Sequence, residues 1–450
     1  MKARNPAVTQ ATQAQIEQLQ SLGWYHSLEL PGGGVIQGLQ SLDQLRWRVR
    51  QFPIPDDLHG KRVLDIGAWD GWFSFEMEKR GASVVAVDSA KSEKLLAGRD
   101  LLGSHVEYHV ASVYDLRPAD IGRFDIVLFL GVLYHLKHPL LALERVCALC
   151  SDLACVESFV TDDDASLFAK PAMEFYETTE LCGQFDNWVG PNLACVMAFC
   201  RAAGFARVSP GSVVDNRAHI TCWRTWDQPA GGGPAPFVVA VENSTTAGQV
   251  FSEASDDYIS VWFKVSEGSL TEGEVFPEVG GFAVRPVLLN NTGGDGWRAI
   301  VKLPPGIGAG WRDVRVRVRG SAWSNTVSIG VDIGDDERRR QGAVTDVRAE
   351  DFRIEIVADG KTWERNQVRI RPGACVSLWV RGLPGGCGRA DVVVRLGDHE
   401  LPSAFVSEVD PQGLRQVNAL LPGGLAPGRQ MLRVAARAWI TPGVSVEIVG

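Results

Sequence analysis

Apolar and polar residues follow two different patterns along the chain, and the change falls near residue 226. Before it, apolar runs of strand type, such as RVLDIG at 62–67 and SVVAVD at 83–88, alternate with helix-like stretches. After it, helical periodicity nearly vanishes and short β-branched runs follow one another between Gly, Pro and Asn turns. The first pattern predicts a Rossmann-like α/β domain with a parallel sheet, and the second predicts antiparallel β-structure.

The stretch between the two patterns, WDQPAGGGPAP at 226–236, has the composition of a linker, with flexible glycines between stiff prolines. A chain of 450 residues is long enough for more than one buried core. We therefore predict an α/β domain over residues 1–228 and two β-domains over 237–334 and 346–450.

The second half of the chain contains an internal repeat. YISVWFKV at 258 is echoed by CVSLWVRG at 375, and LPPGIGAGW at 303 is echoed by LPGGLAPGR at 421. The matching pairs, at an offset of about 117 residues, are Trp262 with Trp379, Gly310 with Gly428, and Trp323 with Trp439. Each copy is expected to be an immunoglobulin-like β-sandwich, with the recurring tryptophans in its core.

Composition and charge limit the cellular location and the partners that the protein is expected to have. No apolar run approaches the length that spans a bilayer, and the polar start has no signal core, which predicts a cytoplasmic protein without a membrane partner. The net charge of −9 argues against nucleic acid, while homo-oligomer formation stays open. Cys147 and Cys150 are spaced C-x-x-C, but no second pair follows, so buried thiols are favoured over a metal site.

The turn after the first predicted parallel strand has the chemistry of a nucleoside-binding site. Gly67 and Gly71 bracket it, and glycine lets a ligand approach the backbone closely. The next strand ends at Asp88, where a carboxylate is placed to accept both hydroxyls of a ribose. The pattern D-x-G-x-x-x-G starting at Asp65 lacks the extra glycine that a pyrophosphate cradle requires.

This turn resembles the cofactor motif of class I S-adenosylmethionine (SAM) methyltransferases, and the later strands and helices of that fold follow in order. The resemblance implies SAM as the cofactor, with Asp65, Gly67, Gly71 and Asp88 at the turn. It also implies adenine contacts from Val113 and Tyr114, after the third strand.

The segment GVLYHLKHPLLAL at 131–143 resembles the CmoB-like methyltransferases more closely, over about residues 20–225. That resemblance adds Arg46, Leu130 and Tyr134 to the cofactor contacts. Members that use a carboxylated SAM hold its carboxylate with an upstream lysine and a C-terminal arginine, as well as the tyrosine, and the lysine and the arginine have no counterpart here. An unpaired carboxylate would be costly in a closed site, so ordinary SAM is expected.

Three residues are candidates for catalysis. His135 follows the fourth strand and His26 lies in a glycine-rich segment, and each is either a general base or a structural histidine. Glu157, inside the fifth strand, matches a family acid. The run Asp162–Asp164 is either a divalent-cation site or a solvated loop.

Three further residues are candidates for binding the acceptor. Tyr25 lies beside His26, and Trp188 and Asn192 precede the last predicted helix, where Asn192 is equally suited to cap that helix.

The pattern predicts a SAM-dependent methyltransferase acting on a small-molecule or glycan acceptor, at oxygen. One alternative is a CmoB-type enzyme that modifies the wobble uridine of tRNA. Another is a SAM-sensing scaffold whose β-domains recognise carbohydrate or protein.

Overall fold

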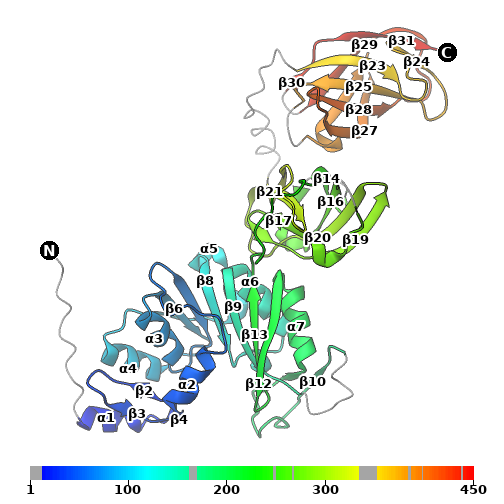
Figure 1. The fold of residues 1–450 in the computed structure, drawn as a ribbon. Helices are drawn as coiled ribbons and strands as arrows, with labels where there is room; N and C mark the ends of the chain where they lie inside the picture. Colours follow the sequence, from blue (N-terminus) through cyan, green and yellow to red (C-terminus); the bar gives the residue numbers. More distant parts are fainter. Residues whose placement is uncertain are drawn as a thin grey trace, which may run out of the picture. The chain divides into compact units, whose positions relative to one another are not determined.

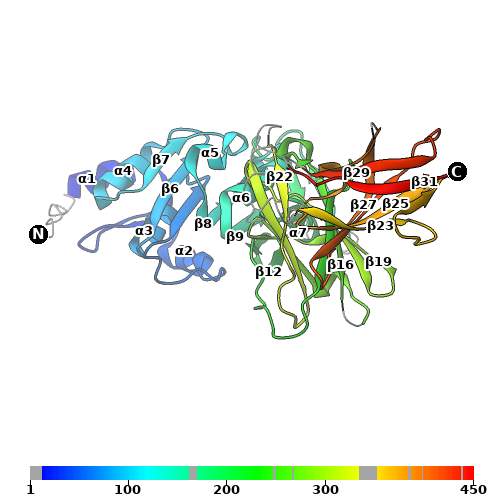
Figure 2. The same ribbon diagram turned by 90° about the horizontal axis from the view of Figure 1, so that it is seen from above.

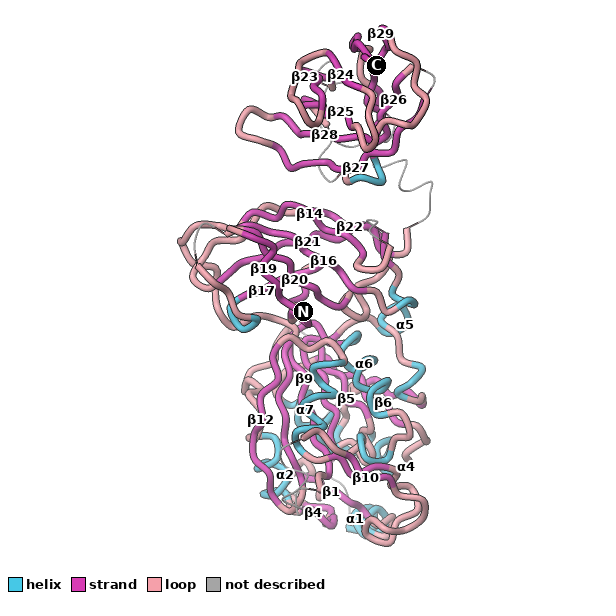
Figure 3. The backbone as a smooth tube through the Cα atoms, turned by 90° about the vertical axis from the view of Figure 1, so that its right-hand side faces the viewer, coloured by secondary structure: helices cyan, strands magenta, loops and turns pink. Residues whose placement is uncertain are grey.

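The computed structural model of the chain describes residues 13–161, 170–246, 250–265, 268–333, 352–383, 387–397, 399–436 and 439–450. The chain divides into two compact units, Met1–Asp227 with Pro304–Gly306, and Gln228–Leu303 with Ile307–Gly450. The α-helices belong to the first unit, and the second is built of strands, loops and short 3-10 turns (Figure 3). None of the helices in the described ranges is long and apolar enough to span a membrane.

A seven-stranded sheet organises the first unit, in the order β12-β13-β9-β8-β5-β6-β7. Its strands are β5 Arg62–Ile66, β6 Ser83–Asp88, β7 Glu107–Val110, β8 Phe124–Leu130, β9 Cys150–Phe159, β12 Arg207–Val214 and β13 Arg217–Trp223. The first five run parallel, while β13 is antiparallel to both β9 and β12. The apolar runs form the strands expected of them, and the Rossmann-like prediction is confirmed.

Helices cover both faces of this sheet (Figure 1). They are α2 Leu42–Val49, α3 Trp72–Lys79, α4 Glu93–Leu102, α5 Pro118–Ile121, α6 Pro139–Leu149 and α7 Leu193–Ala202. Apolar residues of α2, α3 and α4 share one core with Val63 of β5, whereas α6 and α7 share a second core with Leu64. Neighbouring residues of one strand thus enter opposite cores, as the pleat requires.

The segment before α2 forms short paired strands. It contains α1 Gln13–Gln20, β1 Trp24–His26, β2 Leu28–Glu29, β3 Val35–Ile36 and β4 Gly38–Gln40. β1 runs parallel to β4, and β2 is antiparallel to β3. Gly38 is needed for this pairing, because a Cβ there would lie 2.5 Å from the carbonyl carbon of His26. A further pair, β10 Met173–Phe175 and β11 Val189–Pro191, follows the large sheet's fifth strand in sequence.

The first β-repeat consists of two sheets, ordered β14-β16-β20-β19 and β15-β22-β21-β17-β18. The strands are β14 Phe237–Asn243, β15 Val250–Phe251, β16 Tyr258–Lys264, β17 Val275–Val279, β18 Phe282–Ala283, β19 Pro286–Gly293, β20 Gly296–Lys302, β21 Gly310–Val318 and β22 Val327–Val331. Valines of both sheets, including Val261, Val314 and Val316, fill the core between them.

The second β-repeat, coloured yellow to red in Figures 1 and 2, repeats this strand order. Its strands are β23 Arg353–Asp359, β24 Gln367–Arg369, β25 Cys375–Arg381, β26 Val392–Leu396, β27 His399–Val409, β28 Leu414–Leu420, β29 Gly428–Ala436, β30 Trp439–Ile440 and β31 Val444–Val449. β27 is long enough to pair with both β26 and β28, and so joins the two sheets. The β-sandwich prediction is confirmed for both repeats.

The repeated tryptophans do not fill the sandwich cores as expected. Trp262 and Trp379 are half-buried on the sheet face turned away from the valines. The Arg298 guanidinium lies 4.9 Å from the Trp262 ring, and that of Arg315 lies 4.2 Å from the Trp323 ring. Arginine contacts therefore explain the Trp262 and Trp323 rings better than core packing does, while the Trp379 ring contacts that of Trp363. The side chain of Trp439 is not among those that the structure describes.

The glycine- and proline-rich stretch after residue 227 is not a free tether. The Gly231 and Gly233 amides donate to the carbonyls of Ser321 and Gly320, over 2.8 and 3.0 Å. A Cβ at Gly231 would lie 2.3 Å from the Gly320 oxygen, so the close approach requires glycine. The expectation of a flexible linker is wrong for these residues, because they hydrogen-bond along the first β-repeat.

Candidate functional site

The turn between β5 and α3 is shaped by glycines at positive φ. Gly67 has φ +77°, and a Cβ there would lie 2.3 Å from Val132, in the loop after β8. Gly71 caps α3 at φ +89°. The amides of Gly67 and Ala68 donate to the carbonyl of Val87, which ties the turn to β6. The predicted glycine turn is present at the carboxyl end of the sheet, and both glycines are required by close packing, Gly67 against Val132 and Gly71 against Phe75.

Asp88 closes this site at the end of β6. Its Oδ2 accepts a hydrogen bond from the Trp69 amide at 2.9 Å, and Oδ1 accepts one from the Ala90 amide at 3.4 Å. Backbone donors thus orient the carboxylate beside the turn. Trp69, which sequence reasoning did not single out, has φ +54° and is 55% exposed next to Asp88. A bulky residue in the left-handed region is uncommon and marks the turn as a constrained one.

Asp65 points into the protein. It is buried and accepts a hydrogen bond from the Ser74 hydroxyl at 2.6 Å. Burial raises the pKa of its carboxyl to about 6. The expected contact between Asp65 and a ligand is corrected to a structural role, because the carboxylate fastens α3 to β5.

The predicted adenine-contact residues follow β7. Val113 is buried in the short turn Val113–Asp115, and the Tyr114 hydroxyl accepts a hydrogen bond from the His138 amide at 3.0 Å. His138 occupies the N-cap position of α6, without a capping hydrogen bond from its side chain. Leu130 ends β8, half-buried beside Gly131. These residues gather at the same end of the sheet as Asp88, and their contacts with adenine stay predictions.

His26 and Tyr25 are held against the glycine turn by Asp70. The Asp70 carboxylate accepts hydrogen bonds from the backbone amides of Tyr25 at 3.0 Å and of His26 at 2.8 Å. It also pairs with Nδ1 of His26. Both members of this pair are buried. An acid that the sequence analysis passed over therefore joins the N-terminal segment to the cofactor turn.

Glu157 lies at the centre of a buried ionic group, which we call the Glu157 network: Arg48, Glu157, Arg217 and Tyr134. Oε2 accepts from Nε of Arg48 at 2.8 Å, and Oε1 lies 3.3 Å from Nη1 of Arg217. The same Arg217 nitrogen donates to the Tyr134 hydroxyl at 2.7 Å. With a guanidinium on each oxygen, Glu157 is not placed to take a proton from an acceptor, so its expected catalytic role is corrected to a positioning one.

His135 has the environment of a general base. Its Nδ1 lies 3.1 Å from the carbonyl of Asp186, which can only accept, so Nδ1 carries the proton and Nε2 is the acceptor nitrogen. Burial lowers the pKa of the imidazole below its ordinary value of 6.5, which keeps it neutral at pH 7. Its ring stacks on Tyr134 at 4.2 Å, so the base adjoins the Glu157 network.

Trp188 and Asn192 have different roles. Trp188 is half-buried, with Nζ of Lys137 4.1 Å from its ring, and its amide donates to the Tyr134 carbonyl. The Asn192 side chain caps α7 through the Cys195 amide at 2.8 Å and also bonds the backbone of Lys170 and Ala172. The expected binding role of Asn192 is therefore corrected to a helix cap, while Trp188 remains beside the site.

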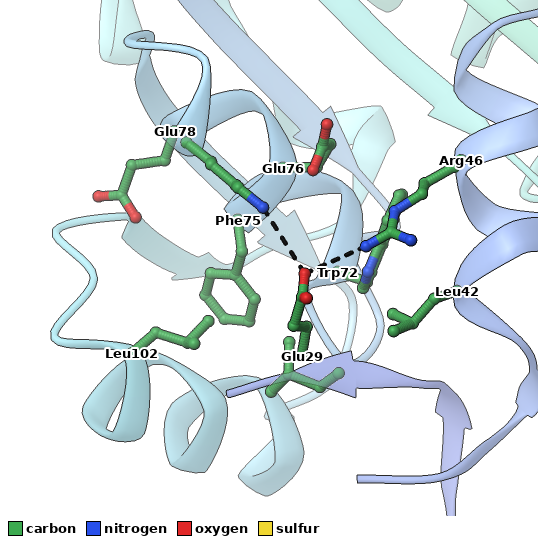
Figure 4. Close-up of a pocket in the computed structure, with 10 residues that line it drawn as sticks. Glu29, Leu42, Arg46, Trp72, Phe75, Glu76, Glu78 and Leu102 are labelled. Atoms are coloured by element: carbon green, nitrogen blue, oxygen red, sulfur yellow. Dashed lines mark hydrogen bonds and ion pairs between the residues drawn. The ribbon is translucent and has the colours of Figure 1, made fainter. Parts of the chain in front are cut away.

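Arg46 is directed away from the glycine turn. Nη2 lies 3.1 Å from Glu29, and the side chain lines an open pocket with Trp72, Phe75 and Glu29 (Figure 4). Neither Gly67 nor Asp88 lines that pocket. The expected cofactor contact of Arg46 finds no support in this placement, and on α2 it is Arg48 that enters the Glu157 network, because residues two apart on a helix point to different sides.

Metal binding finds no support among the described residues, where no group of three or more His, Cys, Asp and Glu is arranged to hold an ion. Asp162–Asp164 lie outside the described residues. Cys147 and Cys150 are buried thiols, as predicted, and Arg224 donates a hydrogen bond to the Cys147 sulfur.

Comparison with known proteins agrees with this geometry. Residues 40–187 match the family model described as a methyltransferase domain. This part of the chain is a methyltransferase domain. The match covers the glycine turn, Asp88, Tyr134 and Glu157, and it confirms the predictions of a methyltransferase domain and of SAM as its cofactor.

The relatives of the methyltransferase domain include tRNA U34 carboxymethyltransferases. The protein of Pseudomonas paraeruginosa is 31% identical over 183 residues, which are 38% of this chain and 55% of the relative. That of Azotobacter vinelandii is 28% identical over 191 residues, 40% of this chain and 57% of the relative. The chain thus spans little more than half the length of these relatives.

Among solved structures, the N-terminal domain of EvdMO1 with S-adenosylhomocysteine (SAH) bound is 20% identical, with a TM-score of 0.37. The match covers 49% of this chain and 99% of that one.

In the methyltransferase domain the predicted SAM contacts lie at the carboxyl end of the sheet. Val132 packs against Gly67, where a Cβ would lie 2.3 Å from it, and the Asp88 carboxylate, oriented by the Trp69 amide, stays the predicted ribose contact. SAM supplies an activated methyl group on a sulfonium centre. The domain's part is to hold the cofactor and place the acceptor in line with the methyl group.

Proposed function

We propose that the protein transfers the methyl group of SAM to a hydroxyl of a small-molecule or glycan acceptor. The observation that carries this proposal is the position of His135 beside Tyr134, with Nδ1 fixed on the Asp186 carbonyl. A neutral imidazole with an acceptor Nε2 suits the removal of a hydroxyl proton as the methyl group is transferred.

The surroundings of His135 support a small acceptor. Its ring contacts that of Tyr134, whose carbonyl accepts a hydrogen bond from the Trp188 amide. Aromatic walls with a few hydroxyl donors are typical of sites that bind small polar molecules. A soluble protein of the cytoplasm without a nucleic-acid partner fits this proposal, as does the net charge of −9.

The test is methyl transfer from radiolabelled SAM to a panel of phenols, sugars and oligosaccharides, using the full chain. We expect at least one hydroxyl compound to be labelled and the label to be lost in His135→Ala. His109→Ala is the matched control, because His109 is a partly exposed histidine of the same domain that pairs with Glu107. SAM binding without transfer to any member of the panel would favour a SAM-sensing scaffold.

A second candidate is carboxymethyl transfer to tRNA, which the names of the relatives suggest. Arg217 on the Tyr134 hydroxyl favours it, because the sequence predicted no counterpart of the arginine that holds the carboxylate in such enzymes. Against it, Glu157 already pairs with Arg217 and the chain has an acidic net charge. Competition between SAM and carboxylated SAM for the full chain separates the two, and we expect SAM to bind at least as tightly.

A further inference from the structure

The two β-repeats carry a tryptophan at the same position of one sheet, but its surroundings differ between them. In the first repeat, Trp262 of β16 pairs with Arg298 of β20, whose guanidinium lies 4.9 Å from the centre of the indole ring. Glu242 accepts a hydrogen bond from the indole nitrogen of Trp262 at 3.2 Å. The ring and its polar atom are therefore both engaged by charged residues of the same repeat.

The second repeat has lost both of these charged partners. Trp379 of β25 pairs with Gln416 of β28, where the first repeat has its arginine. Ala358, which pairs with the residue two positions before Trp379, stands where the first repeat has Glu242. The Trp379 indole nitrogen is not buried, and no acceptor among the described residues pairs with it. Its hydrogen-bonding capacity is thus available to a ligand.

A second tryptophan contacts the Trp379 ring. Trp363 lies in the segment between β23 and β24, and the centres of the two rings are 5.8 Å apart at an angle of 50°. Trp363 is 56% exposed and has φ +63°, which is an uncommon conformation for a bulky residue. An indole that is more than half exposed gains little from burial to offset this conformation, so packing alone does not account for it.

Amide groups continue this surface beside Trp379, on the sheet that contains β23, β25, β28 and β27 (Figure 1). Val417 is in the core, so its neighbours Gln416 and Asn418 are on the opposite face. Nε2 of Gln416 donates to Oδ1 of Asn418 at 3.0 Å, while Oε1 of Gln416 and Nδ2 of Asn418 have no partner among the described residues. Asn418 pairs with Phe405 of β27, which is 42% exposed. We call this surface the tryptophan platform: Trp363, Trp379, Gln416, Asn418 and Phe405.

Indole rings beside amide groups suit the binding of a sugar. The faces of a pyranose carry C–H groups that pack on aromatic rings, and its hydroxyls both donate and accept hydrogen bonds. The tryptophan platform provides rings and free amide atoms and has no ionisable side chain, so it matches an uncharged ligand. A purely apolar partner would cover the amides of Gln416 and Asn418 without giving them hydrogen bonds, which is unfavourable.

We propose that the tryptophan platform binds a neutral carbohydrate. A sugar ring stacks on the indoles of Trp363 and Trp379, and its hydroxyls form hydrogen bonds with the amides of Gln416 and Asn418. At the corresponding position of the first repeat, the arginine and the glutamate already engage the tryptophan. The inference goes beyond the proposed methyl transfer and does not depend on it, because the platform belongs to the second β-repeat and not to the methyltransferase domain.

The experiment uses the full chain and a panel of neutral oligosaccharides: cellohexaose, mannohexaose, xylohexaose, maltohexaose and hexa-N-acetylchitohexaose. Binding is measured by tryptophan fluorescence and by ligand-observed NMR titration. We expect at least one sugar to bind with a dissociation constant of about 1 mM or lower. Affinity should fall tenfold or more in Trp363→Ala and Trp379→Ala. Trp363 is largely exposed, so its variant should fold, and thermal unfolding checks this.

A matched pair of exchanges between the repeats provides the control. Gln416→Arg copies the first repeat and should abolish measurable binding, because the guanidinium would cover the Trp379 ring. Arg298→Gln makes the reverse change in the first repeat and should leave binding unchanged. SAM affinity, measured on the same samples, should be the same in every variant.

Binding of no sugar in the panel would overturn the inference. So would binding that both tryptophan variants leave within twofold of wild type, or that Arg298→Gln weakens as much as Gln416→Arg does. Self-association of the full chain that Trp363→Ala abolishes, without sugar binding, would assign the platform to a second copy of the chain instead. Failure of the wild-type chain to bind SAM, with sugar binding intact, would refute the proposed function alone.

Discussion

Replacing Asp88 with alanine should remove most of the affinity for SAM. The carboxylate is aligned by the Trp69 amide at 2.9 Å and is expected to accept two ribose hydroxyls. A hydrogen bond to a charged group contributes about 1.5–3 kcal/mol, so two contribute roughly 3–6 kcal/mol. At about 1.4 kcal/mol per factor of ten, the dissociation constant should rise roughly a hundredfold to ten-thousandfold.

Calorimetric titration of the full chain with SAM and SAH measures this change. Asp125→Ala is the matched control, because Asp125 Oδ2 also accepts one backbone amide, that of Arg62, at 2.9 Å, but at the opposite end of the strands. Each variant loses a carboxylate that accepts a backbone amide, and thermal unfolding measures the stability that each one loses. Affinity in Asp88→Ala within threefold of wild type would refute the ribose assignment.

Three other results are expected. NMR of histidine-labelled protein should give the His135 imidazole a pKa below 6.5. Methyl transfer should then be constant above pH 6.5 and fall only at lower pH, as the base is protonated. A pKa above 6.5 would remove the argument for a base. Arg46→Ala should change SAM affinity by less than threefold, whereas a tenfold loss would return Arg46 to the cofactor site. The fragment 1–228 should fold and bind SAM, but with about 1–3 kcal/mol lower stability, because buried Arg224 loses the Pro305 carbonyl; an insoluble fragment would show that the chain folds as one obligate unit.

The strands and their order could be predicted because burial imposes strong patterns on the sequence. β5, β6 and β8 are buried on both faces, so their sequences are nearly continuous apolar runs. Gly67 and Asp88 were equally accessible to prediction, since the turn and the strand end are local features. The repeat was visible because both copies bury the same valine pattern.

Long-range side-chain partners were not accessible in this way. Arg217 meets Tyr134 across 83 positions, and Arg48 meets Glu157 across 109. No local signal marks such pairs. The family resemblance pointed to Arg46, but the direction of each side chain on α2 depends on how that helix packs on the sheet. Asn192 is the opposite case, because an asparagine directly before an apolar helical run predicts an N-terminal helix cap.

The most direct test of the account is a crystal structure of the full chain with SAH. We predict that the ribose hydroxyls lie within hydrogen-bonding distance of the Asp88 carboxylate, that the ligand passes over Gly67, and that its sulfur faces Tyr134 and His135. SAH bound with its ribose elsewhere, or in the pocket lined by Arg46 and Trp72, would contradict the account.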